Sequence, residues 1–181
     1  KDKVKVLYPR RLCKARGWNI CTELAIEMTN EFDNILFSFV GRGGNENSED
    51  FMRELSKRNK KIEYDWYDMN NMHKAYKNTD IVLIPSLYSE GTSLSLLEAM
   101  ACGKAVIAGL VGGLTDLIIN GYNGILIDIT KNNLKNEILS LAEDYERRLE
   151  LGRNARMVAE SFSKEIWEKR WMDILTKQFT K

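Results

Sequence analysis

Short apolar runs alternate with longer amphipathic or polar stretches from the start of the chain to Asn132. Each run has four to six residues, and together they predict β-strands at 4–9, 35–40, 61–66, 80–85, 105–108 and 124–127. The stretches between them predict helices at 18–31, 46–59, 71–78, 92–103 and 115–119. Strands that alternate with helices form a parallel sheet covered on both faces. The pattern therefore predicts an α/β fold with a Rossmann-like, doubly wound parallel sheet.

The pattern after Asn132 is helical only. We expect about three segments, divided near Arg147 and near 161–163, as a helical C-terminal extension of the domain. Trp167 and Trp171 lie four residues apart and so share one side of the last segment, where core packing is the simplest interpretation. We therefore expect a single domain over residues 1–181.

The composition is that of an ordinary globular protein, with 44% hydrophobic and 29% charged residues. The net charge is only +1, so no overall field favours nucleic acid, and any anion site must be local. Cys13, Cys21 and Cys102 form no CxxC pair, which argues against a zinc site or a disulfide framework. A cytoplasmic setting follows.

No targeting or membrane signal is visible in the sequence. The longest apolar-rich stretch, 105–114, is far shorter than the roughly 20 residues that span a bilayer. The chain begins at Lys1 with a predicted strand almost at once, so we expect it to be part of a longer protein.

Ligands of doubly wound sheets bind at the carboxyl ends of the strands. After the first strand, the sequence has no G-x-G-x-x-G fingerprint but instead four basic residues, Arg10, Arg11, Lys14 and Arg16. Guanidinium groups are planar forks that suit phosphate oxygens. A solvated basic loop is the alternative, but the position at a strand end favours a diphosphate site.

The next two strand ends carry weaker signals. Gly41 begins a glycine-rich segment, GRGG, that is either a plain turn or a close approach to a ligand. Trp66 and Tyr67 follow the third strand, where an aromatic ring either stacks on a base or packs at the rim of the core.

The helix predicted at 92–103 contains a single charge, Glu98, among small and apolar residues. Thr92 or Ser93 is expected to cap the helix, which points its first amides towards the crevice. We expect Glu98 to be buried and therefore to need a partner, either an arginine or the vicinal hydroxyls of a ribose. Glu90, in the loop before the helix, could reach further hydroxyls of the same ligand.

The loop after the fifth strand repeats this arrangement. Paired glycines come before Thr115, which we expect to cap a short helix, and Asp116 lies in its first turn. A tight turn and a contact with phosphate or sugar are both open here.

Three motifs in this order resemble the retaining glycosyltransferases of family 4. They are R-L-x-x-x-[KR]-G at 11–17, P-S-x-x-x-E-G-x-x-L-x-x-L-E-A-M-A-x-G at 85–103, and V-G-G-x-x-[ED]-L-I followed by N-G-x-N-G-x-L at 111–126. Glu90 and Glu98 form the E-x7-E motif of that family, and the resemblance covers nearly the whole chain.

The resemblance implies the donor-binding, C-terminal domain of a two-domain GT-B enzyme, with the N-terminal acceptor domain outside this chain. It assigns the diphosphate to Arg11 and Arg16, the ribose to Glu98 and the transferred sugar to Glu90. The last helix of such enzymes often crosses back to the other domain, so an exposed face with Trp167 and Trp171 is the alternative to core packing. Further donor contacts are implied for the loop before the helix and for the base end, at Gly91, Thr92, Ser93, Leu94, Trp66, Tyr67 and Gly41.

The implied reaction is transfer of a hexose, with retention, from a UDP- or GDP-sugar to a glycan or lipid-linked acceptor in cell-surface polysaccharide synthesis. The resemblance implies no metal and no cofactor beyond the donor, and it leaves open a peripheral association of the whole protein with the inner face of the membrane. Many members have Phe-Gly where this chain has Thr92 and Ser93, so the preferred sugar is open. A sugar-nucleotide epimerase on the same scaffold and a non-catalytic binding module are the alternatives.

Overall fold

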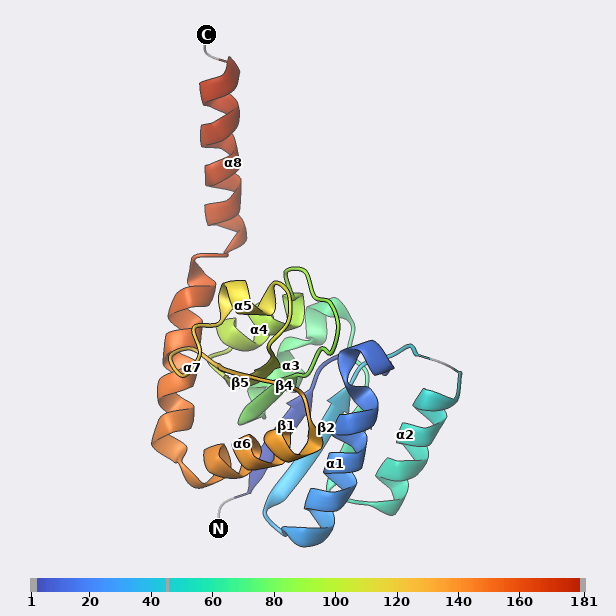
Figure 1. The fold of residues 1–181 in the computed structure, drawn as a ribbon. Helices are drawn as coiled ribbons and strands as arrows, with labels where there is room; N and C mark the ends of the chain where they lie inside the picture. The colour runs from blue at the N-terminus through green and yellow to red at the C-terminus, as the bar shows by residue number, and fades with distance from the viewer. Residues whose placement is uncertain (1–2, 45, 180–181) are drawn as a thin grey trace.

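The computed structural model describes residues 3–44 and 46–179, and Figure 1 shows strands at the centre with helices around them. The sheet has six strands, all parallel, in the order β3-β2-β1-β4-β5-β6. Their bounds are β1 Val4–Tyr8, β2 Ile35–Val40, β3 Ile62–Asp65, β4 Ile81–Ile84, β5 Ala105–Gly109 and β6 Ile125–Ile127. The predicted α/β fold is confirmed.

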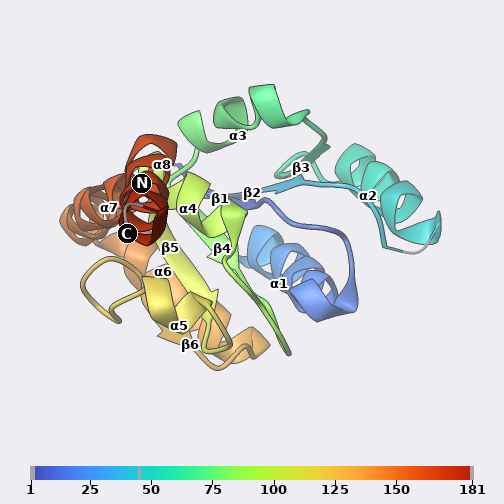
Figure 2. The same ribbon diagram turned by 90° about the horizontal axis from the view of Figure 1, so that it is seen from above.

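Eight helices are described, along with single 3-10 turns at Lys14–Arg16 and Met69–Asn71. Their bounds are α1 Trp18–Glu31, α2 Glu46–Arg58, α3 His73–Lys77, α4 Leu94–Ala101, α5 Leu114–Leu117, α6 Lys131–Glu143, α7 Tyr145–Glu160 and α8 Lys164–Phe179. One face of the sheet packs against α1, α2 and α6, and the other packs against α3, α4, α5 and α7, as Figure 2 shows for most of them. A separate apolar core lies on each face.

The strand order changes direction between β1 and β4. β1 pairs with β2 on one side, and with β4 on the other, where Val6 lies opposite Ile81. The loops that follow β1 and β4 therefore leave the sheet side by side at its carboxyl edge, although they are far apart in the sequence. Such a reversal is where open α/β sheets bind their ligands.

The C-terminal extension is helical, as predicted, but it differs in two details. The first boundary falls at Asp144, whose side chain accepts a hydrogen bond from the Arg147 amide and so caps α7 three residues earlier than expected. The helix α8 has no buried residue and projects from the domain (Figure 1). Trp167 is 60% exposed and Trp171 is 48% exposed, so the expected core packing is wrong, and the alternative of an exposed face agrees with the structure.

The loop after β5 also differs from expectation. Thr115 lies inside α5, and its hydroxyl donates to the carbonyl of Gly112, so it does not cap the helix.

None of the helices described over residues 3–44 and 46–179 is long and apolar enough to cross a membrane.

Candidate functional site

A cavity of about 470 Å3 opens at the carboxyl edge of the sheet, next to the reversal between β1 and β4. Its volume is within the range of sites that hold small molecules. Its walls come from the loops after the first four strands and from the start of α4, with Pro9, Arg10, Arg11, Arg16, Val40, Gly41, Arg42, Trp66, Tyr67, Met72, Glu90, Thr92, Ser93, Leu94, Ser95 and Glu98. Every residue that the resemblance assigns to the site, except Gly91, lines this cavity, although the individual roles stay predictions. Of the four basic residues after the first strand, Lys14 is not among the lining residues.

The loop after β1 is held in shape by a buried phenol. The hydroxyl of Tyr8 lies 2.7 Å from the carbonyl oxygen of Arg11 and 3.1 Å from that of Arg16. Burial raises the pKa of Tyr8, which keeps the phenol protonated and able to donate to these carbonyls. Tyr8 thus fixes the backbone from which the basic side chains project.

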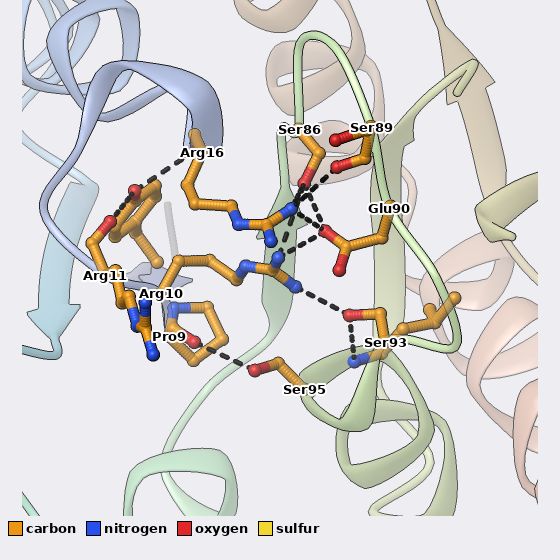
Figure 3. A network of polar contacts seen from close by, with 11 residues as sticks. Pro9, Arg10, Arg11, Arg16, Ser86, Ser89, Glu90, Ser93 and Ser95 are labelled. Atoms are coloured by element: carbon orange, nitrogen blue, oxygen red, sulfur yellow. Dashed lines mark hydrogen bonds and ion pairs between the residues drawn. The ribbon is translucent and has the colours of Figure 1, made fainter. Parts of the chain in front are cut away.

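Glu90 is the buried carboxylate of the site. Its side chain is 8% exposed, and its Oε2 atom accepts hydrogen bonds from Arg10, from Arg16 at 2.5 Å and from the Ser86 hydroxyl at 2.6 Å. Figure 3 shows both guanidinium groups directed at this carboxylate, whereas the Arg11 side chain points elsewhere. Charge-assisted hydrogen bonds of this kind offset the cost of burying a carboxylate.

Arg10 is the central residue of this cluster, although the resemblance assigned it no role. Its side chain is 7% exposed, and it also donates to the Ser93 hydroxyl at 2.6 Å and to Ser86 at 3.3 Å. The sequence places it in the basic loop but gives no indication that it turns inwards. Its position two residues beyond β1, matched by Arg42 two residues beyond β2, is the signal that could have identified both.

Glu98 is exposed, so the expectation of a buried carboxylate in α4 is wrong. Its Oε2 atom accepts a hydrogen bond of 2.8 Å from the Tyr76 hydroxyl on α3. Burial of the ring, followed by the charge of Glu98, raises the pKa of Tyr76, so the phenol stays a donor. Glu98 faces the cavity rather than the core, and the partner within the protein is a tyrosine rather than an arginine.

The start of α4 faces the same cavity. Ser93 is the N-cap residue and accepts a hydrogen bond from the Leu96 amide. Ser93, Leu94 and Ser95 line the cavity, so the N-terminus of the helix borders it. Leu94 is 66% exposed, whereas Leu96 is fully buried. The partial positive charge of the helix N-terminus adds to that of the arginines.

The far end of the cavity carries aromatic rings. The Arg42 guanidinium lies 4.3 Å from the centre of the Trp66 ring, a cation–π contact that orients both groups beside Tyr67. Gly41 precedes them, and the Tyr64 hydroxyl donates to its carbonyl at 3.2 Å. A Cβ at Gly41 would lie 2.1 Å from the Arg10 carbonyl, so only glycine lets the loops after β1 and β2 approach this closely.

Basic side chains outnumber acidic ones in this cavity, with Arg10, Arg11, Arg16 and Arg42 against Glu90 and Glu98. The arrangement can neutralise an anion while offering a carboxylate to hydroxyl groups and a flat ring to a base. Among the described residues, no three histidine, cysteine, aspartate or glutamate side chains gather as a metal site requires.

Comparisons with known proteins point to one family. The profile described as "Glycosyl transferases group 1" matches residues 1–158. A protein of Methanocaldococcus jannaschii, named as an uncharacterized glycosyltransferase, is 30% identical over 177 residues, which are 93% of this chain and 43% of that protein. The N,N'-diacetylbacillosaminyl-diphospho-undecaprenol alpha-1,3-N-acetylgalactosaminyltransferase of Campylobacter jejuni is 38% identical over 100 residues, 54% of this chain and 26% of that protein.

A solved structure shares the fold. The crystal structure of the C-terminal domain of a group 1 family glycosyltransferase from Francisella tularensis matches with a TM-score of 0.75 at 25% identity, over 88% of this chain and 86% of that domain. The chain spans less than half of the length of the two enzymes above, 43% of one and 26% of the other.

Proposed function

Because the chain belongs to the group 1 glycosyltransferases, we propose that it forms the donor-binding, C-terminal domain of a two-domain GT-B enzyme. In this proposal residues 1–181 hold a nucleoside diphosphate sugar, and a second, N-terminal domain holds the acceptor. The match over 86% of a domain solved by itself, the C-terminal domain from Francisella tularensis, supports this division.

The cluster of basic groups at the carboxyl edge of the sheet carries the proposal. The cavity is lined by Arg11 and Arg16, which follow β1, and by the N-terminus of α4. These groups would bind the diphosphate and stabilise the charge that builds up on it as the glycosyl bond breaks. Under this proposal the arginines supply the positive charge that a metal ion supplies elsewhere.

The remaining groups of the cavity fit the other parts of the donor. Glu98 is an exposed carboxylate that can accept two hydrogen bonds from ribose hydroxyls, with Tyr76 fixing its position. Trp66, oriented by Arg42, offers a face to the base. Glu90 pairs with Arg10 and Arg16 and lines the same cavity, where it would contact the transferred sugar.

We propose a UDP- or GDP-hexose as the donor and transfer with retention, as in the family 4 enzymes with an E-x7-E motif. The acceptor would be a glycan or a lipid-linked sugar, and the name of the Campylobacter jejuni relative, whose acceptor contains undecaprenol, supports the second choice. The exposed side of α8 that carries Trp167 and Trp171 is where we expect the N-terminal domain to pack.

Calorimetric titration of the chain with UDP, GDP and ADP tests the donor assignment. We expect one of the first two to bind, without added divalent metal, and Arg11→Ala to weaken that binding. Glu98→Gln should weaken the nucleotide more than inorganic diphosphate, because only the nucleotide has a ribose. Equal losses for both ligands, or unchanged affinity in Arg11→Ala, would refute the assignment of those residues.

A further inference from the structure

We propose that Arg10 is a positioning residue of the donor site, which holds Glu90 and balances its charge so that the charge of Arg16 stays available to the diphosphate. The proposal rests on the donor-binding function above and assigns a role to a residue to which the family resemblance gave none. It follows from the way the two guanidinium groups share one carboxylate.

Both terminal nitrogens of the Arg10 guanidinium donate hydrogen bonds within the protein. Its Nη1 atom donates to Ser93, and its Nη2 atom donates to Ser86 and to Glu90. Its side chain is also the more buried of the two, 7% exposed against 29% for Arg16. A buried guanidinium with this many partners is fixed in place and suits a supporting role rather than contact with a ligand.

The Arg16 guanidinium uses fewer of its nitrogen atoms in hydrogen bonds within the protein than Arg10 does. Within the part of the chain that the structure describes, its side chain makes hydrogen bonds through Nη1 alone, to Glu90, to the Ser89 carbonyl at 2.9 Å and to Ser86 at 3.4 Å. Its Nη2 and Nε atoms remain for a ligand. It is therefore the one of the pair that can hold a phosphate oxygen.

The charges of the cluster lead to the same assignment. Glu90 carries one negative charge and meets two positive ones, so the cluster keeps a net positive charge. Without Arg10, Glu90 would neutralise Arg16 from 2.5 Å, and the diphosphate would lose one of its cations. Arg10 thus strengthens diphosphate binding without touching the diphosphate.

Arg10 also belongs to the set of three groups that leave one carboxylate oxygen of Glu90 free. In Figure 3 the dashed lines from Arg10, Arg16 and Ser86 converge on a single oxygen of Glu90, Oε2, and the other oxygen has none. Oε1 is then the atom available to a hydroxyl of the transferred sugar. Because Ser93 both binds Arg10 and caps α4, the same contacts tie this carboxylate to the start of the helix.

The test is a double-mutant cycle on UDP or GDP affinity, measured by calorimetry with whichever nucleotide the unmodified chain binds. Arg10→Gln should weaken binding about tenfold or more, the size expected when Glu90 neutralises Arg16 and its charge-assisted hydrogen bond to a phosphate oxygen is lost. Arg10→Lys should restore most of the affinity, since it returns the charge. Glu90→Gln should bind at least as tightly as the unmodified chain, because it releases Arg16.

The decisive comparison is between Glu90→Gln and the double variant Arg10→Gln/Glu90→Gln. We expect the same nucleotide affinity for both, because no carboxylate is left to neutralise Arg16. A tenfold loss on adding Arg10→Gln in that background would mean that Arg10 itself binds the diphosphate, and would overturn the proposal. The double variant removes both buried charges, so this comparison stands even if Arg10→Gln alone does not fold.

Arg58→Gln is the matched control, since Arg58 is an exposed arginine at the end of α2 that, among the residues the structure describes, pairs only with Glu54. It should leave nucleotide affinity unchanged. If the unmodified chain binds neither UDP nor GDP, the donor-binding function fails. If it binds and Arg10→Gln binds equally well, only the role of Arg10 fails.

Discussion

Gly112→Ala should both destabilise the fold and displace Glu90. The Gly112 backbone has φ of +48°, and a Cβ there would lie 2.3 Å from the Glu90 carbonyl oxygen. The next residue, Gly113, donates its amide to that same carbonyl at 2.9 Å, so the loop after β5 supports the loop that carries Glu90. A side chain at Gly112 would have to push this support away.

The expected cost has two parts. The left-handed backbone costs an alanine about 1–2 kcal/mol. The overlap with the Glu90 backbone adds about 1–3 kcal/mol, as overpacking in a close-packed region does. Gly121 isolates the first part, because it has φ of +79° but no atom within 4 Å of its Cβ position. Gly121→Ala should therefore cost only the conformational term.

Urea unfolding measures both variants against the unmodified chain, with a titration of UDP and a UDP-hexose at each. We expect Gly112→Ala to lose clearly more free energy of unfolding than Gly121→Ala, and to lose affinity for the sugar nucleotide. Equal losses in the two variants, with ligand binding intact in Gly112→Ala, would refute the idea that the loop after β5 supports Glu90.

Further outcomes follow from the same contacts. Trp66→Ala should weaken nucleotide binding by about 1–3 kcal/mol, as loss of base stacking does, and leave inorganic diphosphate binding unchanged; an equal effect on both would exclude Trp66 as the base platform. Because the folded state holds the Tyr76 proton to a higher pH than the unfolded chain, stability should fall as pH rises above about 10, and Tyr76→Phe should reduce that slope by up to about 1.4 kcal/mol per pH unit. Parallel slopes in urea unfolding at pH 9 to 11.5 would contradict this. Trp167→Ser on the exposed side of α8 should change stability by less than about 0.5 kcal/mol; a loss above about 2 kcal/mol in thermal unfolding would show that the ring is buried.

The alternation of apolar runs with helical stretches was enough to predict the fold, because a strand buried on both faces, such as Ile81–Ile84, contains only apolar residues. The same rule places candidate ligand residues at strand ends, which brought Arg16 and Glu98 to one cavity. The pattern did not predict which side chains at the start of a helix are exposed. Leu94 and Glu98 belong to the first turns of α4, where exposure depends on neighbours that the sequence does not specify.

Contacts between side chains of different loops cannot be predicted from a local pattern in the sequence. Glu90 and Arg10 are 80 positions apart, and only the reversal of strand order between β1 and β4 brings them together. We expected the buried carboxylate to be Glu98, but it is Glu90. The apolar character of α4 does not indicate whether the preceding loop is buried. The prediction that the tryptophans of α8 are buried was also wrong. Helical spacing predicts that they share one side of the helix, but not whether another element covers that side.

A crystal structure of the chain with UDP bound, at the affinity measured in solution, tests the donor-site assignment most directly. It should place the diphosphate oxygens within hydrogen-bond distance of Arg11 and Arg16, the ribose hydroxyls on Glu98 and the base against Trp66. Arg10 should keep its contacts with Glu90 and Ser93. A nucleotide bound outside the cavity, or with its ribose turned away from Glu98, would contradict the proposed function.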